Sequence, residues 1–228
     1  MKLFWCVVPA AGRGTRVGGD IPKQYLPLVG QPLIAHTLRR LAGHPSIAGL
    51  VVTLSGSDNL WPGWSSIESK PVLTAIGGAE RCDSVLAGLD ALPASVGADD
   101  FVLVHDAARP CVRLADIDAL IAQATANDGG LLGAPLRDTL KRANASGRSL
   151  ATEPREARWR AFTPQMFRRA QLAAALREAR AQGLQVSDEA MAMERAGFAP
   201  CLVEGAEDNL KVTTAADFAL AEFLLTRT

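Results

Sequence analysis

Continuous apolar runs that alternate with stretches of helical periodicity set the fold class of this 228-residue chain. The stretches beginning at Gln31, Ala79 and Leu114 carry apolar residues at helical spacing. The apolar runs are unbroken, which is typical of strands buried on both faces; they lie at residues 3–10, 47–55, 71–78, 100–108 and 129–136. We therefore expect an α/β fold, with a doubly wound, mostly parallel sheet covered by helices on both faces.

Residues 137–162 break this alternation, because they carry many charges and no apolar run. The residues Asn144–Gly147 are typical of a turn, which predicts a protruding, hairpin-like β-arm. An arm without a core of its own usually packs on another chain. We therefore expect a homodimer that forms through this arm.

Three helices are expected after the arm. One begins near Pro164, one is capped by Ser187, and the last begins at about Thr214. Because no repeat or low-complexity linker interrupts the pattern, we expect residues 1–228 to form a single domain.

The charge balance excludes several classes of partner. The 24 basic and 24 acidic residues cancel, so no overall field draws the protein to nucleic acid or to an anionic membrane. No run approaches the roughly 18 apolar residues of a membrane span, and the N-terminal run has no signal-peptide cleavage pattern. The four cysteines lie far apart and lack zinc-ligand spacing. We expect a cytoplasmic protein with reduced thiols.

A glycine-rich loop follows the first apolar run. It fails the dinucleotide fingerprint, because Val17 stands where a third glycine should follow Gly12 and Gly14. It also fails the Walker A pattern, because Lys23 is followed by glutamine. Two cations, Arg16 and Lys23, on one irregular loop suit a triphosphate, whose charge is spread over several oxygens. The alternative is an ordinary solvated turn.

Two later segments carry further candidates. Asp106, in “HDAARP”, follows the fourth apolar run, where ligands bind in such sheets. It could coordinate Mg²⁺ that bridges phosphates, or it could cap the next helix. His105 is more consistent with a packed histidine than with a base. Lys211, in “EDNLKVTT”, would by itself be read as a surface lysine.

Seven ordered blocks extend over nearly the whole chain: “PAAGRGTRVGGDIPKQYLPLVGQPLI”, “GGAERCDSVLAGL”, “HDAARPCV”, “PLRDTLKRA”, “RAFTPQMF”, “SDEAMAMERAG” and “EDNLKVTT”. Together they resemble the 2-C-methyl-D-erythritol 4-phosphate cytidylyltransferases of the non-mevalonate isoprenoid pathway. The resemblance implies a Rossmann-like nucleotidyltransferase sheet and a transferase. Such an enzyme moves the cytidylyl group of CTP to 2-C-methyl-D-erythritol 4-phosphate and releases pyrophosphate, with Mg²⁺ or another divalent cation as cofactor.

The resemblance also implies roles for particular residues. Arg16, Lys23 and Lys211 would be the catalytic cations. The nucleotide would contact Ala10, Ala11, Gly12, Gly78 and Ser84. The second substrate would contact Asp106, also a candidate metal ligand, together with Arg109, Thr139, Arg155, Thr163 and Ser187. In the family, the counterparts of Thr139 and Arg155 come from the partner's arm.

Two departures from the family pattern and three alternative functions stand beside this interpretation. Ala79 replaces a residue that is often polar in relatives, and Ser187 replaces a frequent threonine but keeps a hydroxyl.

A ribitol 5-phosphate cytidylyltransferase would share the nucleotide half. A non-catalytic nucleotide-binding module would be expected to lack the cations that this chain keeps. A nicotinamide dehydrogenase is disfavoured by Val17.

Overall fold

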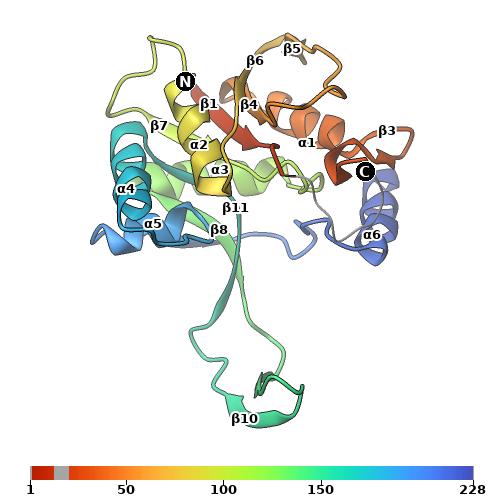
Figure 1. Ribbon diagram of the computed structural model, residues 1–228, viewed down its shortest axis with the longest axis vertical. Coiled ribbons are helices and arrows are strands. Elements are labelled where there is room, and N and C mark those ends of the chain that lie inside the picture. Colours follow the sequence, from red (N-terminus) through yellow and green to blue (C-terminus); the bar gives the residue numbers. More distant parts are fainter. Residues whose placement is uncertain (1, 13–20, 228) are drawn as a thin grey trace.

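The computed structural model describes residues 2–12 and 21–227, and within these ranges an eight-stranded sheet forms the centre of the molecule (Figure 1). In spatial order the strands are β12 (Cys201–Glu204), β8 (Gly130–Pro135), β11 (Trp159–Arg168), β7 (Phe101–Val104), β1 (Phe4–Pro9), β4 (Ile47–Leu54), β6 (Lys70–Ile76) and β5 (Ser66–Ile67). Neighbouring strands are parallel except around β11, which is antiparallel to β7 and β8, and at β5, which is antiparallel to β6. The expected doubly wound, mostly parallel sheet is confirmed.

Helices cover both faces of the sheet (Figure 1). One core contains side chains of α1 (Leu33–Ala42) and α3 (Leu114–Ala126), and the other those of α2 (Arg81–Asp90), α4 (Arg169–Ala181) and α5 (Glu189–Arg195). Along β1, Cys6 and Val8 join the first core and Val7 joins the second, because successive side chains of a strand point to opposite faces. The unbroken apolar runs of the sequence therefore serve two cores at once.

The prediction of a helix that begins near Pro164 is wrong. This segment belongs to β11, and α4 begins only at Arg169. Residues 162–167 are all buried, because β11 is inserted between β7 and β8, with Gln165 opposite Val104 on one side and Leu131 on the other. A place in the middle of the sheet thus outweighs the helix-starting preference of proline. Strand β12 was also not expected; it extends the sheet beside β8.

The predictions for the starts of the last two helices have different outcomes. The cap of α5 is Asp188, whose carboxylate accepts from the amide of Met191, so the prediction of Ser187 is wrong by one residue. The helix expected from about Thr214 is confirmed as α6 (Ala215–Thr226), and the structure adds that Thr214 caps it: its side chain accepts from the amide of Asp217, and the carboxylate of Asp217 accepts from the amide of Thr214. None of the helices in the described ranges has both the length and the apolar composition to span a bilayer.

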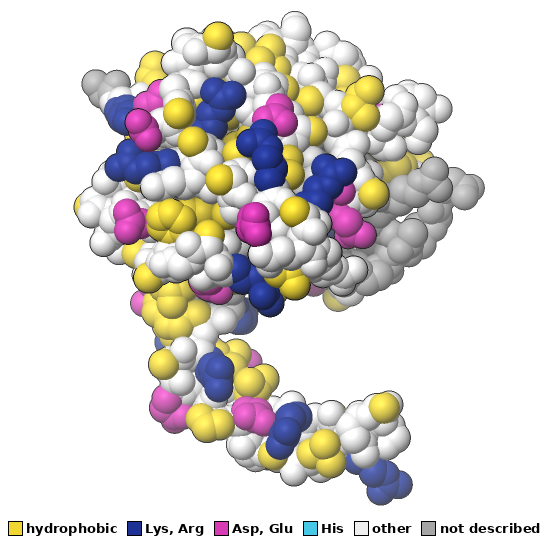
Figure 2. All heavy atoms as spheres, turned by 60° about the vertical axis from the view of Figure 1, so that its left-hand side comes forward, with side chains coloured by type: hydrophobic (Ala, Val, Ile, Leu, Met, Phe, Trp, Pro, Cys, Tyr) yellow, Lys and Arg dark blue, Asp and Glu magenta, His cyan; other side chains and the backbone are white. Residues whose placement is uncertain are grey.

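The arm projects from the sheet as a two-stranded hairpin, β9 (Leu140–Ala143) and β10 (Ser149–Glu153), and stands clear of the body (Figures 1 and 2). Its turn is the expected one: the side chain of Asn144 accepts from the amides of Ser146 and Arg148. Leu150 is 60% exposed. The hairpin is confirmed, whereas dimerisation through it stays a prediction.

Candidate active site

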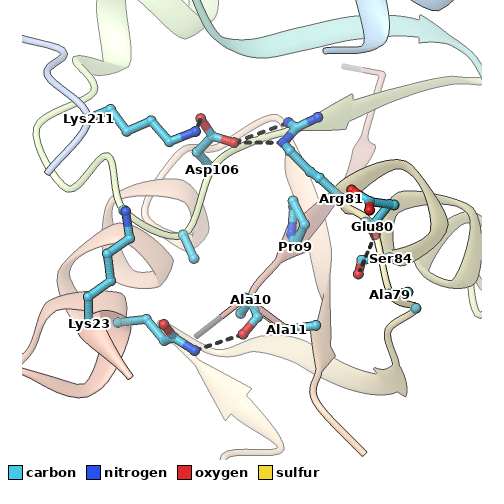
Figure 3. A pocket seen from close by; sticks show the side chains of 15 residues that line it. Pro9, Ala10, Ala11, Lys23, Ala79, Glu80, Arg81, Ser84, Asp106 and Lys211 are labelled. Atoms are coloured by element: carbon cyan, nitrogen blue, oxygen red, sulfur yellow. Dashed lines mark hydrogen bonds and ion pairs between the residues drawn. The ribbon is translucent and has the colours of Figure 1, made fainter. Parts of the chain in front are cut away.

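The carboxyl ends of β1 and β7, together with the loop after β6, surround a cavity of about 310 Å³ (Figure 3). This is where ligands bind in doubly wound sheets. Most of the predicted site residues that the structure describes meet here. The cavity is lined by Pro9, Ala10, Ala11, Gly12, Lys23, Gln24, Gly78, Ala79, Glu80, Arg81, Ser84, Asp106, Ala107, Ala108 and Lys211.

One end of the cavity is small and mostly uncharged. Its floor is the end of β1, where the backbone carbonyl of Ala10 accepts from Nε2 of the buried Gln24 at 2.8 Å. Gly77 lies so close that a Cβ there would sit 2.7 Å from both the Cβ of Ala11 and the Oγ of Ser84. Only glycine allows this approach. The narrow space between the backbone and a hydroxyl suits the edge of a flat base.

The opposite side of the cavity carries lysines. Lys23 begins the short 3₁₀ helix η2 (Lys23–Tyr25), and its Nζ donates to the carbonyl oxygen of Val212 at 2.9 Å. Lys211, the residue before Val212, lines the same cavity. The hydrogen bond therefore brings two lysines from distant parts of the sequence to one wall. Arg16, the third predicted cation, lies outside the described residues.

Asp106, at the end of β7, is the charge centre of the site. Its carboxylate lies 3.1 Å from Arg81, 3.0 Å from Nζ of Lys211 and 3.3 Å from Nε of Arg109, and its side chain is only 9% exposed. Burial opposes ionisation, but the charges of Arg81, Lys211 and Arg109 outweigh it and hold the pKa of Asp106 well below its usual range. Asp106 is therefore a permanent anion inside a net cationic group.

Two buried side chains, those of Thr163 and His105, hold the backbone around Asp106 in place. The Oγ1 of Thr163 accepts from the amide of Asp106 at 3.0 Å and donates toward Nδ1 of His105 at 3.1 Å, which leaves Nε2 of His105 to donate to the carbonyl of Arg109. Burial lowers the pKa of His105 to about 4, so the ring is neutral at pH 7. His105 is fully buried, and the prediction of a packed histidine is confirmed.

Arg109 is buried beside Asp106. Its Nη1 donates to the backbone carbonyl of Asn209 at 2.7 Å, and its guanidinium lies 5.2 Å from the centre of the Phe162 ring. Asn209 in turn donates to the carbonyl of Thr163. These contacts tie the segment before Lys211 to the wall behind Asp106.

Sequence reasoning missed two charged residues of the site. Arg81 donates from Nη1 and Nη2 to the two carboxylate oxygens of Glu189, at 2.5 and 3.0 Å, and from Nε to Asp106. Glu189 has no exposed surface. A signal was present, since Arg81 follows the glycines of “GGAER” at the same sheet edge as Asp106. Glu189 offered none, because its position depends on where α5 packs.

Comparison with known proteins decides the family. The family model described as IspD, 2-C-methyl-D-erythritol 4-phosphate cytidylyltransferase, matches residues 4–227. The chain belongs to this family. A relative of that name from Xanthomonas euvesicatoria pv. vesicatoria (strain 85-10) is 62% identical over 223 residues, which cover 97% of this chain and 84% of the relative.

Solved structures agree with this assignment. The 2-C-methyl-D-erythritol 4-phosphate cytidylyltransferase of Francisella tularensis superposes with a TM-score of 0.84 at 31% identity, covering 98% of this chain and 100% of that one. The enzyme of the same name from Thermus thermophilus gives a TM-score of 0.80 at 31% identity, with all of both chains covered. The chain is thus a member of a nucleotidyltransferase family, and the ribitol 5-phosphate alternative is not favoured.

Five residues predicted by the family resemblance do not line the cavity: Arg109 and Thr163, which are buried next to Asp106, and Thr139, Arg155 and Ser187. Thr139 and Arg155 lie on the arm, where Arg155 donates to the backbone carbonyl of Arg137. Ser187 is exposed and borders a neighbouring cavity of about 450 Å³, which shares Glu80 and Arg81 with the first. Their roles in substrate binding stay predictions.

The described residues of this site could supply only a small part of the ligand shell of a divalent cation. The described residues contain no group of three or more His, Cys, Asp or Glu side chains that could hold a metal ion. Asp106 offers one carboxylate, but three cations already surround it. Mg²⁺ commonly takes one or two protein carboxylates and completes its shell with phosphate oxygens and waters. Most ligands would therefore have to come from the nucleotide.

Proposed function

We propose that this protein transfers a cytidylyl group from CTP to 2-C-methyl-D-erythritol 4-phosphate. The observation that carries the proposal is the meeting of Lys23, Lys211 and the small Ala10–Gly12 floor in one cavity of a chain that belongs to this family. An oxygen of the 4-phosphate attacks the α-phosphorus of CTP, and the bond from that phosphorus to the bridging oxygen of pyrophosphate breaks. The products are 4-diphosphocytidyl-2-C-methyl-D-erythritol and pyrophosphate.

The residues act by position and charge. Because the attacking phosphate is already an anion, the reaction needs no strong general base, and it requires no covalent intermediate. Lys23, Lys211 and Arg16 neutralise charge that develops on the phosphoryl oxygens, which is worth more in a site with little water. The backbone around Ala10 and Gly78, with the hydroxyl of Ser84, reads the cytosine edge.

The proposed cofactor is Mg²⁺ or another divalent cation. When bound beside the triphosphate, this ion would withdraw negative charge from the phosphate oxygens. Asp106 is the residue of this cavity proposed to contribute an oxygen, as a metal ligand or toward substrate hydroxyls. The surrounding Arg81, Arg109 and Lys211 keep that carboxylate ionised for either role.

The acceptor half of the site is proposed to involve two chains. Asp106, Arg109, Thr163 and Ser187 would face 2-C-methyl-D-erythritol 4-phosphate from one subunit. Thr139 and Arg155 of the partner subunit would reach it on the arm of a homodimer. The protein would work in the cytoplasm as a single catalytic domain with this arm.

The experiment is an assay of pyrophosphate release with CTP, 2-C-methyl-D-erythritol 4-phosphate and Mg²⁺. We expect turnover with this acceptor and much less with ribitol 5-phosphate run beside it. Binding of CTP without turnover would overturn the proposal in favour of a non-catalytic nucleotide-binding module. Omission of the divalent cation and its replacement after chelation test the cofactor.

A further inference from the structure

Arg81 joins two carboxylates that come from distant parts of the chain. Asp106 ends a central strand, whereas Glu189 begins helix α5 on one face of the sheet. The guanidinium contacts both: Nε and Nη2 lie 3.1 Å from Oδ1 of Asp106, and Nη1 and Nη2 hold both oxygens of Glu189. No segment of sequence predicts this bridge.

The three side chains of the bridge differ in burial. Glu189 has no exposed surface, the Asp106 side chain is 9% exposed and the Arg81 side chain is 25% exposed. Among the ion pairs of residues 2–12 and 21–227, Glu189 is paired with Arg81 alone. A buried carboxylate with one cationic partner holds that partner strongly, because losing it would leave the charge uncompensated. Glu189 therefore fixes where the guanidinium of Arg81 lies.

Arg81 and Lys211 approach Asp106 from opposite sides (Figure 3). Lys211 contacts Oδ2 at 3.0 Å, while Arg81 contacts Oδ1. Because Arg81 already compensates Glu189, Asp106 keeps negative charge, which attracts Lys211 and Arg109 to its other oxygen, Oδ2. The orientation of one carboxylate thus determines where the ammonium group of Lys211 is held.

We propose that Arg81 is a positioning residue: anchored by Glu189, it orients the carboxylate of Asp106 and, through it, the ammonium of Lys211 at the wall of the cavity. This inference rests on the cytidylyl transfer proposed above. A lysine could not replace Arg81, since only the planar guanidinium fork reaches both carboxylates at once.

The first test is chemical rescue of Arg81→Ala. We expect kcat to fall by about ten- to a hundredfold, the scale of a misplaced transition-state donor, with the KM for CTP changed less than about threefold. Because Arg81 lines two open cavities, added guanidinium at non-denaturing concentrations should reach the vacated space and raise the kcat of Arg81→Ala about tenfold. Sodium chloride at the same ionic strength should restore none. A folded Arg81→Ala enzyme that guanidinium does not rescue would overturn the proposal.

Two conservative variants keep the test decisive if Arg81→Ala does not fold. Arg81→Lys retains the charge and Glu189→Gln retains the shape, so both should fold, yet each should lower kcat at least about fivefold. The matched control is Arg177→Ala, which removes an exposed arginine paired with Asp90 at 2.7 Å and should match wild type. A near-normal kcat in Arg81→Lys would refute the positioning role. Wild-type turnover in the same assay tests the proposed function separately.

Discussion

The walls of the cavity are held by buried hydrogen bonds on a central sheet, whereas the arm is held by one two-stranded ladder with mostly exposed side chains. Around Asp106, the bonds to Thr163 and Arg81 join elements that lie far apart in the sequence. On the arm, the contacts are local, as in the ion pair of Arg142 with Glu153 across the hairpin. The two regions thus obtain order from different sources.

This difference indicates what each region needs in order to function. An isolated two-stranded hairpin is marginally stable in water, so we expect the arm to gain stability by packing against another surface. The cavity has its order within one chain, so we expect it to bind the nucleotide without help from a second chain. The predictions below test this division, from the largest expected effect to the smallest.

The first prediction compares two carboxylates, one from each region. Glu189→Ala removes the buried partner of Arg81 and should lower the free energy of unfolding by about 3 kcal/mol, because two charge-assisted hydrogen bonds are lost from the interior. Glu153→Ala on the arm should lower it by less than about 1 kcal/mol, since its arginine is largely solvated. Urea unfolding measures both. Equal losses would contradict the comparison.

The second prediction compares two lysines. Lys23→Ala should lower kcat by at least about a hundredfold, or about 2.7 kcal/mol, by removing a phosphate-neutralising group, and Arg16→Ala should do the same. Lys141→Ala on the arm, where Nζ donates to Thr152 across the hairpin, should lower kcat less than about threefold. The assay is pyrophosphate release. A folded Lys23→Ala enzyme with near-normal kcat would refute the assigned role.

The third prediction concerns pH, which should affect the cavity wall through His105. Its folded pKa of about 4 lies below the ordinary value of 6.5, so its contribution to stability is present above pH 6.5 and is lost as the pH falls toward 4. The free energy of unfolding should drop by about 2 kcal/mol between pH 7 and pH 5 from this group. In His105→Gln the drop should shrink by that amount. An unchanged pH dependence would show that another group is responsible.

The smallest expected effect lies on the arm. Arg155→Ala should lower kcat/KM for the acceptor by about tenfold and leave CTP binding unchanged. Mixing Arg155→Ala with Lys23→Ala subunits then tests whether the arm crosses between chains. Random exchange gives one intact site in half of the dimers, so activity should recover to about a quarter of wild type. No recovery would place the arm's action within its own chain.

The sequence predicted the elements whose signal is local. The strands at β1, β4, β6, β7 and β8 appeared as continuous apolar runs, and the Asn144 turn and the start of α6 near Thr214 depend on neighbours a few residues away. Strand β11 was not predicted, because Pro164 locally favours the start of a helix. Its burial between β7 and β8 is a property of the whole sheet.

The prediction of the site was likewise limited to residues that lie in local motifs. The motifs led to Lys23, Asp106 and Lys211, and the structure places these three side chains on one cavity. The bridge between Arg81 and Glu189 could not be read from spacing, because it depends on where α5 packs against the sheet. Long-range ion pairs between packed elements leave no periodic pattern in a sequence.

The arm and the cavity wall share one strand, because β11 runs from the base of the arm into the sheet. It starts at Trp159, opposite Pro135, and continues to Arg168. Thr163, midway along it, holds the amide of Asp106. One strand therefore connects the base of the arm by continuous backbone to the hydroxyl that holds the main chain of the central carboxylate.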